Sequence, residues 1–155
     1  MQFTPEQIEK MRAIGLRLDR AGTFWHEDAA VSHPRLRQAL LRWLDVRAED
    51  GRDIVKLDDK RYAYVDVEDA HLRALSARWD GDRCIVLWDD DQDEELAYAT
   101  LRQAEDHALY VTARGSLRGR IAGPAYHAIA ERIAEAGGAY VLEAAGQRWP
   151  IANAA

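Results

Sequence analysis

Short runs of strand-forming residues, separated by tight turns, recur along most of the chain, and this pattern limits the choice of fold more than any other feature. In the clearest case Leu72 to Arg78 and Arg83 to Trp88 flank Asp80-Gly81, a strong hairpin signal. Such turns pair antiparallel strands that are neighbours in sequence. The predicted hairpins join 16–19 to 23–26, 54–57 to 61–67, 72–78 to 83–88, 109–113 to 117–121 and 140–143 to 148–151, and a further strand is predicted over 96–101.

Three helices are predicted among these hairpins. Thr4, Pro5 and Gln7 form a capping pattern that begins a helix ending near residue 14. A second helix begins at Ser32-His33-Pro34, and a third begins at Pro124 and ends at Gly137-Gly138. We expect their apolar faces to be buried: Leu36, Ala39, Leu40, Trp43 and Leu44 on the second, and Tyr126, Ile129, Ala130 and Ile133 on the third. The combination predicts an α+β fold with antiparallel sheets.

The second and third helices align when the sequence is compared with itself at an offset of 90, which places Pro34 on Pro124 and Trp43 on Ile133. Hairpins flank both helices, and such self-similarity is typical of a duplicated hairpin-helix-hairpin unit. The predicted organisation is an N-terminal helix over 1–15, a first α+β unit over 16–70, and a second over 71–155 with its own helix and C-terminal hairpin. We expect one compact body with a cleft at the seam between its halves.

The net charge of -6 comes from one segment, residues 89–95, which carries six negative charges and no positive one. Without these six of the 27 acidic side chains, acidic and basic side chains balance at 21 each. The chain therefore lacks the basic footprint typical of proteins that bind nucleic acid or an anionic membrane surface. We interpret the acidic segment as a solvated hairpin loop, and as a candidate docking surface for a protein partner.

The cellular location of the protein and the state of its cysteine are predicted from features that the 155 residues do not contain. No apolar run approaches the roughly 20 residues of a membrane span, and the first residues lack the basic and apolar blocks of a signal peptide. These observations predict a cytoplasmic protein. The single cysteine, Cys84, lies in an apolar strand and is predicted to be a small buried hydrophobe, since nothing nearby in sequence would stabilise a thiolate.

Six stretches, in the same order, resemble motifs of an uncharacterised bacterial family, domain of unknown function number 1285. They are 22–27 (Gly-Thr-Phe-Trp-His-Glu), 33–36 (His-Pro-Arg-Leu), 67–70 (Val-Glu-Asp-Ala), 110–121, 125–130 and 146–151. The resemblance implies a duplicated α+β architecture whose second half is superficially like a pleckstrin-homology sheet and helix. It also implies a small-molecule or nucleotide-like ligand at the seam and a signalling role, and it brings no enzymatic reaction.

Arginines around the Gly115 turn are the main candidates for ligand binding. Arg118 and Arg120 lie two residues apart, so their side chains share one side of a strand. They present two permanently charged guanidinium groups, which suit a phosphate or a carboxylate. Aromatic side chains would stack a planar base. The predicted ligand-binding residues are Arg114, Arg118, Arg120, Trp25, Glu68 and Trp149. The alternative is that the arginines form ordinary ion pairs with Glu68, Asp69 or the acidic segment.

Two weaker patterns concern metal ions. His26, Glu27, Asp28 and His33 would supply two imidazoles and two carboxylates, although His33 more simply caps a helix. Asp89, Asp91 and Asp93 have the spacing that opens a calcium loop, but Glu94 stands where that loop needs glycine and Thr100 where it needs glutamate.

These residues favour a non-catalytic binding or signalling module for a small anionic or nucleotide-like ligand, with no cofactor. The usual signatures of enzymes, such as a Walker loop or a nucleophile elbow, do not occur in the sequence. Two alternatives stay open. One is an interaction adaptor that docks a protein through a strand edge or through residues 89–95, and the other is a metal-assisted hydrolase.

Overall fold

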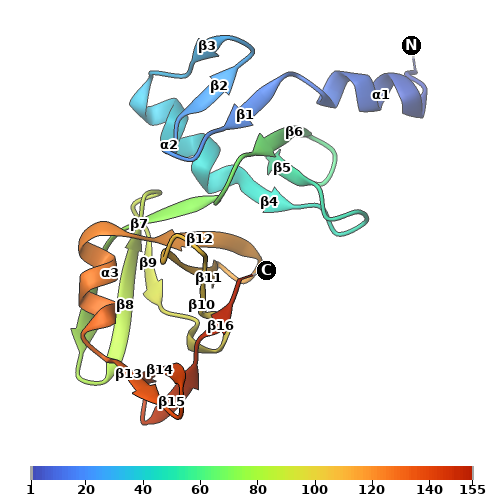
Figure 1. Cartoon of the computed structure of the whole chain (residues 1–155). Coiled ribbons are helices and arrows are strands. Elements are labelled where there is room, and N and C mark those ends of the chain that lie inside the picture. The colour runs from blue at the N-terminus through green and yellow to red at the C-terminus, as the bar shows by residue number, and fades with distance from the viewer. Residues whose placement is uncertain (1, 155) are drawn as a thin grey trace. The chain divides into compact units, whose positions relative to one another are not determined.

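The structure is a computed structural model that describes residues 2–154, and the chain forms two compact units, Met1–His71 and Leu72–Ala155 (Figure 1). Each unit combines helix with a mixed β-sheet, so the fold class is α+β. None of the helices within residues 2–154 has the length and apolar character needed to cross a membrane.

The sheet of the first unit consists of two meanders, each built from consecutive strands. The strand order is β3-β2-β1-β6-β5-β4, with antiparallel pairs inside each meander and a parallel pair, β1 with β6, where the meanders meet. The prediction of antiparallel sheets therefore holds within each meander and is wrong for the β1–β6 pair, because turn signals report only on strands that are neighbours in sequence. The elements are α1 (Pro5–Arg12), β1 (Leu16–Leu18), β2 (Phe24–His26), β3 (Ala29–Ala30), α2 (Pro34–Trp43), β4 (Leu44–Val46), β5 (Asp53–Lys56) and β6 (Tyr62–Val67).

Helix α2 packs against β5, and the set of its side chains that is buried differs from the predicted set. Its buried side chains are Leu40 and Leu41, and Leu44 is buried where the chain passes directly into β4. Trp43, predicted to be core, is 36% exposed, and Leu36 is exposed as well. The buried face of the helix is rotated relative to the predicted one, since it includes Leu41, which the spacing argument left out and which is fully buried.

Polar contacts hold α1 on its sheet, since none of its residues is buried. The capping box of Thr4 and Gln7 is formed as predicted. The Tyr64 hydroxyl donates a hydrogen bond to Glu9, and Arg12 stacks over the Tyr62 ring with 3.9 Å from the guanidinium carbon to the ring centre. The Tyr64 hydrogen bond holds the pKa of Glu9 below its ordinary value of 4.5.

Acidification is expected to release α1 from β6. A carboxyl whose pKa is lowered on folding stabilises the folded state above its ordinary pKa, here 4.5, and this contribution is lost as the pH falls through the folded value. Hydrogen exchange of the α1 amides, followed by NMR from pH 7 to pH 3, should show protection falling in the wild type. Glu9→Gln should remove the protection already at pH 7, whereas Glu6→Gln on the same helix should not. Full protection of α1 in Glu9→Gln would contradict the prediction.

The second unit contains a larger sheet and a small one. The larger sheet has the order β16-β10-β11-β12-β7-β8-β9, with parallel pairs β12 with β7 and β10 with β16, and the small sheet has the order β13-β14-β15. Helix α3 packs against β7. The elements are β7 (Leu72–Asp80), β8 (Arg83–Trp88), β9 (Asp93–Glu95), the 3-10 helix η1 (Tyr98–Thr100), β10 (Arg102–Gln103), β11 (Leu109–Ala113), β12 (Leu117–Ile121), α3 (Gly123–Ala130), β13 (Ile133–Ala136), β14 (Ala139–Ala144), β15 (Gln147–Pro150) and β16 (Ala152–Asn153).

Two predicted elements of this unit are wrong. The third helix ends at Ala130, and Ile133 begins β13, which pairs with β14 across Gly137-Gly138. Both glycines have positive φ, 62° and 84°, which is the conformation that a two-residue hairpin turn needs, so they turn a hairpin rather than end a helix. Residues 96–101, predicted as a strand, contain η1, because the Tyr98 hydroxyl turns inward and accepts a hydrogen bond from the Cys84 amide at 2.9 Å.

The larger sheets of the two units share a strand plan. In the one sheet of the first unit and in the larger sheet of the second, two meanders of consecutive strands meet at a parallel pair, β1 with β6 and β7 with β12 respectively. The second sheet differs in having β16 at its edge, paired in parallel with β10. The helices do not follow this plan, since α2 lies between β3 and β4 whereas α3 follows β12. The sequence offset of 90 that aligns the helices therefore does not align the strands.

Candidate functional site

The acidic segment is divided between buried and exposed positions. The Asp89 carboxylate accepts hydrogen bonds from the Arg73 amide at 3.1 Å and from the Arg73 Nε at 2.6 Å, and it is buried. Asp90 is fully buried and lies 3.1 Å from the Arg114 guanidinium. Only from Asp91 onward does the segment turn outward, and residues 93–95 form β9. The prediction of a solvated loop over 89–95 is therefore wrong for its first two residues, which supply buried counter-charges.

The Arg114–Asp90 pair gives the buried Asp90 carboxylate a counter-charge, from a guanidinium that is itself partly exposed. Burial raises the pKa of Asp90 above its ordinary value of 3.8, and Arg114 opposes this shift by its positive charge. The Arg114 amide also donates to Glu94 at 2.9 Å, so the arginine joins its turn to the acidic segment. The ion pair of Arg114 with Asp90 is a pair with the acidic segment, which is the alternative given for this arginine, although the Asp90 side of the pair is buried.

Arg118 and Arg120 share one face of β12, as their spacing predicts, while Leu117, Gly119 and Ile121 point into the core. Arg120 donates to the Tyr110 hydroxyl and lies 3.2 Å from Asp106. The register also places Arg73 and Tyr110 opposite Arg120, with Arg102 opposite Tyr110 on the next strand. Sequence reasoning missed Arg73 and Arg102, because strand register is decided by tertiary pairing.

The other predicted ligand residues have their polar atoms engaged in the fold. Trp25, in the first unit, donates from Nε1 to Asp19 at 2.9 Å, and Glu68 of the same unit accepts from the Arg20 amide at 3.2 Å. Trp149, in the second unit, stacks on the Tyr98 ring at 5.4 Å and donates to the Ala144 carbonyl at 2.9 Å.

The candidate metal residues are dispersed. His33 caps α2, where its Nδ1 accepts from the Leu36 amide at 3.4 Å, and His26 is exposed on β2. Asp91 and Asp93 are exposed, whereas the Asp89 carboxylate accepts a hydrogen bond from Arg73. Within residues 2–154, no three His, Cys, Asp or Glu side chains are grouped as a metal site requires.

Cys84 is a core residue, as predicted, and is fully buried. Burial raises the pKa of its thiol to about 11, so the thiol stays protonated at neutral pH. A buried, protonated thiol is a poor nucleophile.

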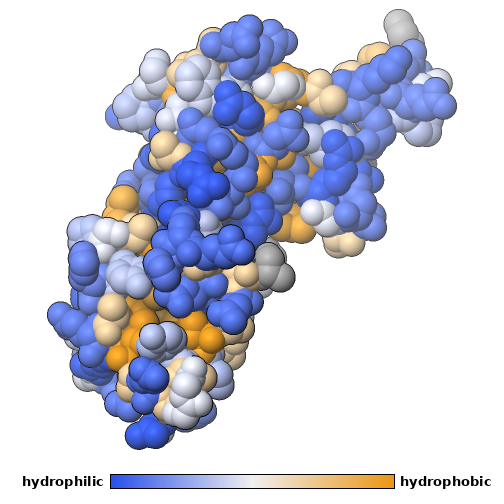
Figure 2. Space-filling model, in the orientation of Figure 1, coloured by the Kyte–Doolittle hydropathy of each residue, from blue (hydrophilic) through white to orange (hydrophobic). Residues whose placement is uncertain are grey.

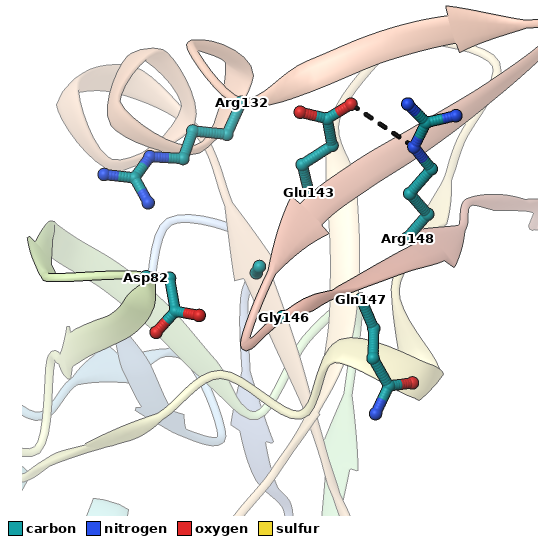
Figure 3. A pocket seen from close by; sticks show the side chains of 7 residues that line it. Asp82, Arg132, Glu143, Gly146, Gln147 and Arg148 are labelled. Atoms are coloured by element: carbon teal, nitrogen blue, oxygen red, sulfur yellow. Dashed lines mark ion pairs between the residues drawn. The ribbon is translucent and has the colours of Figure 1, made fainter.

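An open surface cavity of about 450 Å³ lies at the turn between β14 and β15 of the second unit. Its walls come from three segments: the β7–β8 turn, the connection after α3, and the β14–β15 hairpin. In the view of Figure 3, Arg132 and Asp82 lie on one side of the Gly146 turn and the Glu143–Arg148 ion pair on the other. The lining residues are Asp82, Arg132, Glu143, Ala144, Gly146, Gln147 and Arg148.

Arg132 is the most distinctive side chain of this cavity. Its guanidinium carbon lies 4.0 Å from the centre of the Trp79 ring, and Trp79 is itself fixed by a hydrogen bond of 2.7 Å from its Nε1 to the Ala128 carbonyl. Arg132 forms no ion pair with any of residues 2–154. Stacking on an indole orients the guanidinium while leaving its N–H donors for another acceptor. Sequence reasoning missed Arg132 because it placed this residue inside a longer helix.

Comparisons with known proteins support the fold. The structure is similar to the crystal structure of a DUF1285 family protein from Silicibacter pomeroyi DSS-3, with a TM-score of 0.74 and 18% sequence identity over 90% of this chain and 80% of that one. It is also similar to a DUF1285 family protein from Shewanella baltica OS155, with a TM-score of 0.64 and 12% identity over 77% of this chain and 93% of that one. No protein-family model matches the chain, and no curated protein matches it in sequence. The chain is thus DUF1285-like in fold, as the sequence motifs indicate.

Proposed function

We propose that the protein is a non-catalytic binding module that holds a small anionic ligand in the cavity at the β14–β15 turn, with Arg132 as the main anchor. One observation carries the proposal: a guanidinium stacked on Trp79, without an acidic partner in the described residues, lines a cavity of about 450 Å³. A partly buried arginine with unused donors is suited to a phosphate or carboxylate, which accepts two parallel hydrogen bonds from it.

The remaining lining residues restrict the ligand further. The carboxylates of Asp82 and Glu143 would repel a ligand that carries negative charge at several positions. The anionic group of the ligand therefore faces Arg132, and its hydrogen-bond donors face the two carboxylates. Gln147 offers both a donor and an acceptor. Among the described residues, no serine, cysteine, histidine or lysine lines the cavity, and its carboxylates are those of Asp82 and Glu143.

The test is a thermal-shift screen of the full chain with inorganic phosphate, pyrophosphate, nucleotides, cyclic dinucleotides and simple carboxylates. A ligand present at one hundred times its Kd adds about 2.7 kcal/mol of stability, so we expect at least one of these probes to raise the melting temperature by several degrees. The same probe should shift Arg132→Gln by less than about one degree, because the anchoring charge is lost.

Arg78→Gln is the matched control, because Arg78 is an exposed arginine of the same unit and does not line the cavity. Its ligand-induced shift should equal that of the wild type. Comparing shifts with and without probe within each variant removes any effect of the substitution on the unliganded protein. The proposal is overturned if no anion shifts the wild type, or if Arg132→Gln responds as strongly as the wild type.

We also propose that the two units arose by duplication. Support comes from the shared plan of two meanders meeting at a parallel pair, rather than from the helices. The comparison of the second half with a pleckstrin-homology fold stays a prediction, as does a ligand site at the seam.

The adaptor function is a second candidate, and β9 is the observation that favours it. This strand lies at the edge of the larger sheet of the second unit and carries Asp93 and Glu95 at its exposed positions. Acidic side chains on an edge strand discourage indiscriminate pairing but leave the strand accessible to a basic partner. A pull-down with Asp93→Asn/Glu95→Gln beside the wild type would test this role, and an unchanged set of captured proteins would remove β9 from consideration.

A further inference from the structure

A second cavity of the second unit, of about 380 Å³, is enclosed by segments that are distant in sequence. Its walls come from β10 and the turn after it, β11, α3, the small sheet, and Ile151 between β15 and β16. Figure 2 shows strongly hydrophobic surface on the second unit in the region between the places that α3 and β10 occupy in Figure 1. The lining residues are Gln103, His107, Leu109, Tyr126, Ala130, Ile133, Tyr140 and Ile151.

Within the described part of the chain, the lining has no Asp, Glu, Lys or Arg side chain. Aliphatic side chains form the floor, with Leu109 almost fully buried, and Tyr126 and Tyr140 add two aromatic rings. An ion placed here would lose part of its hydration without gaining a counter-charge from a Lys, Arg, Asp or Glu side chain of the lining, which disfavours a charged ligand. The cavity therefore selects against charged ligands, in contrast to the cavity that Arg132 lines.

Two polar residues, Gln103 and the exposed His107, lie at the wall formed by β10 and its turn. His107 has a φ of 69°, an uncommon conformation for a residue other than glycine, and its amide donates to the Ala104 carbonyl at 2.9 Å. The Gln103 side chain donates to the His107 carbonyl at 3.4 Å, and so keeps the turn and the amide group together. An apolar cavity of this size with a small number of fixed polar groups is the usual form of a small-molecule site.

We propose that this cavity binds an uncharged ligand with a flat apolar ring and one hydrogen-bonding group. The ring packs against the tyrosines and the aliphatic floor, and its polar group bonds to the imidazole of His107 or the amide of Gln103. The site is independent of the anionic ligand proposed above, because Arg132 does not line it. The two cavities are lined by neighbouring residues of the chain, Ala130 and Ile133 in this one and Arg132 in the other.

The probe for the test is 2-naphthol, which is neutral at pH 7, with 2-naphthoate as its anionic counterpart of similar shape. We expect titration of the ¹⁵N-labelled full chain with 2-naphthol to shift the amide signals of residues 103–109, 126–133 and 140 in a saturable way. The naphthoate should bind at least tenfold more weakly. Scattered shifts that do not saturate, or tighter binding of the naphthoate, would overturn the proposal.

Variants locate the site and separate it from the anion site. Ala130→Phe fills the cavity and should weaken 2-naphthol binding at least tenfold, whereas Ala136→Phe, at an exposed position of β13 outside the cavity, should leave it unchanged. Arg132→Gln should also leave it unchanged, whatever that variant does to anion binding. If Ala130→Phe does not fold, Tyr140→Ala at the half-exposed mouth serves instead and should weaken binding at least fivefold. Wild-type affinity in a folded Ala130→Phe or Tyr140→Ala protein counts against the site.

Discussion

Gly119→Ala is expected to destabilise the second unit by about 3 kcal/mol, the upper part of the range for overpacking a well-filled core. A methyl group at Gly119 would lie 2.3 Å from Cη2 and 2.7 Å from Cζ3 of the Trp88 ring, far inside van der Waals contact. Trp88 cannot move aside at low cost, because it is 1% exposed and its Nε1 is held by Glu94 at 2.9 Å. Urea unfolding at pH 7 measures the loss.

The Trp88→Phe background identifies the cause of this loss. The shorter phenylalanine ring leaves the space that the new methyl group needs, so the added cost of Gly119→Ala should fall by at least half in that background. Gly115→Ala is the control for the loss of a glycine as such, since nothing lies within 4 Å of the added methyl and only its positive φ of 80° opposes the change. Its cost should be about 1 kcal/mol. An equal cost of Gly119→Ala in the wild type and in the Trp88→Phe background would contradict the steric explanation.

Arg114→Met is expected to cost about 3 kcal/mol at pH 7, because it leaves Asp90 as a buried charge without its counter-ion. Burial already raises the pKa of Asp90 above 3.8 in the wild type, and removing Arg114 raises it further. An acid whose pKa is raised on folding destabilises the protein as the pH rises through the folded pKa, and has no such effect below the unfolded pKa of about 3.8. The cost should therefore shrink as the pH is lowered from 7 toward 4.

Unfolding in urea at several pH values checks this dependence. Arg114→Met/Asp90→Asn should recover much of the stability at pH 7, since the unpaired charge is gone. Arg83→Met, which breaks the exposed pair with Glu95, should change the free energy of unfolding far less than Arg114→Met at pH 7, because water screens that pair. A cost for Arg114→Met that does not vary with pH would show that its packing, rather than its charge, stabilises the unit.

Elements that depend on local chemistry could be predicted from the sequence. The capping box at Thr4, the His33 cap and the hairpin turn at Gly81 are all present, because each is decided within a few residues by dihedral preference and hydrogen bonding. Predictions failed where the outcome depends on a distant segment. The Gly137-Gly138 pair is compatible both with a helix end and with a hairpin turn, and the pairing of β13 with β14 decides between them.

The same division applies to the candidate sites. The arginines near Gly115 stand out in the sequence, but the partners that define their roles, Asp90 for Arg114 and Asp106 for Arg120, come from other strands and turns. Arg132 and Trp79 are far apart in the chain and stack only because α3 packs on β7. No local sequence pattern predicts a cavity whose walls come from several segments of the chain.

The sequence by itself determined the α+β class, the hairpins, the caps and the burial of Cys84, because turn chemistry and hydrophobic spacing act over short distances. Tertiary structure alone decided the parallel pairs at the centre of each larger sheet, the burial of Asp89 and Asp90, and the gathering of Arg132 with Trp79. The reason is that a sequence does not show how deeply a charged side chain will be buried. A run of aspartates predicts a solvated surface, and only the packing of distant segments buries two of them beside Arg73 and Arg114.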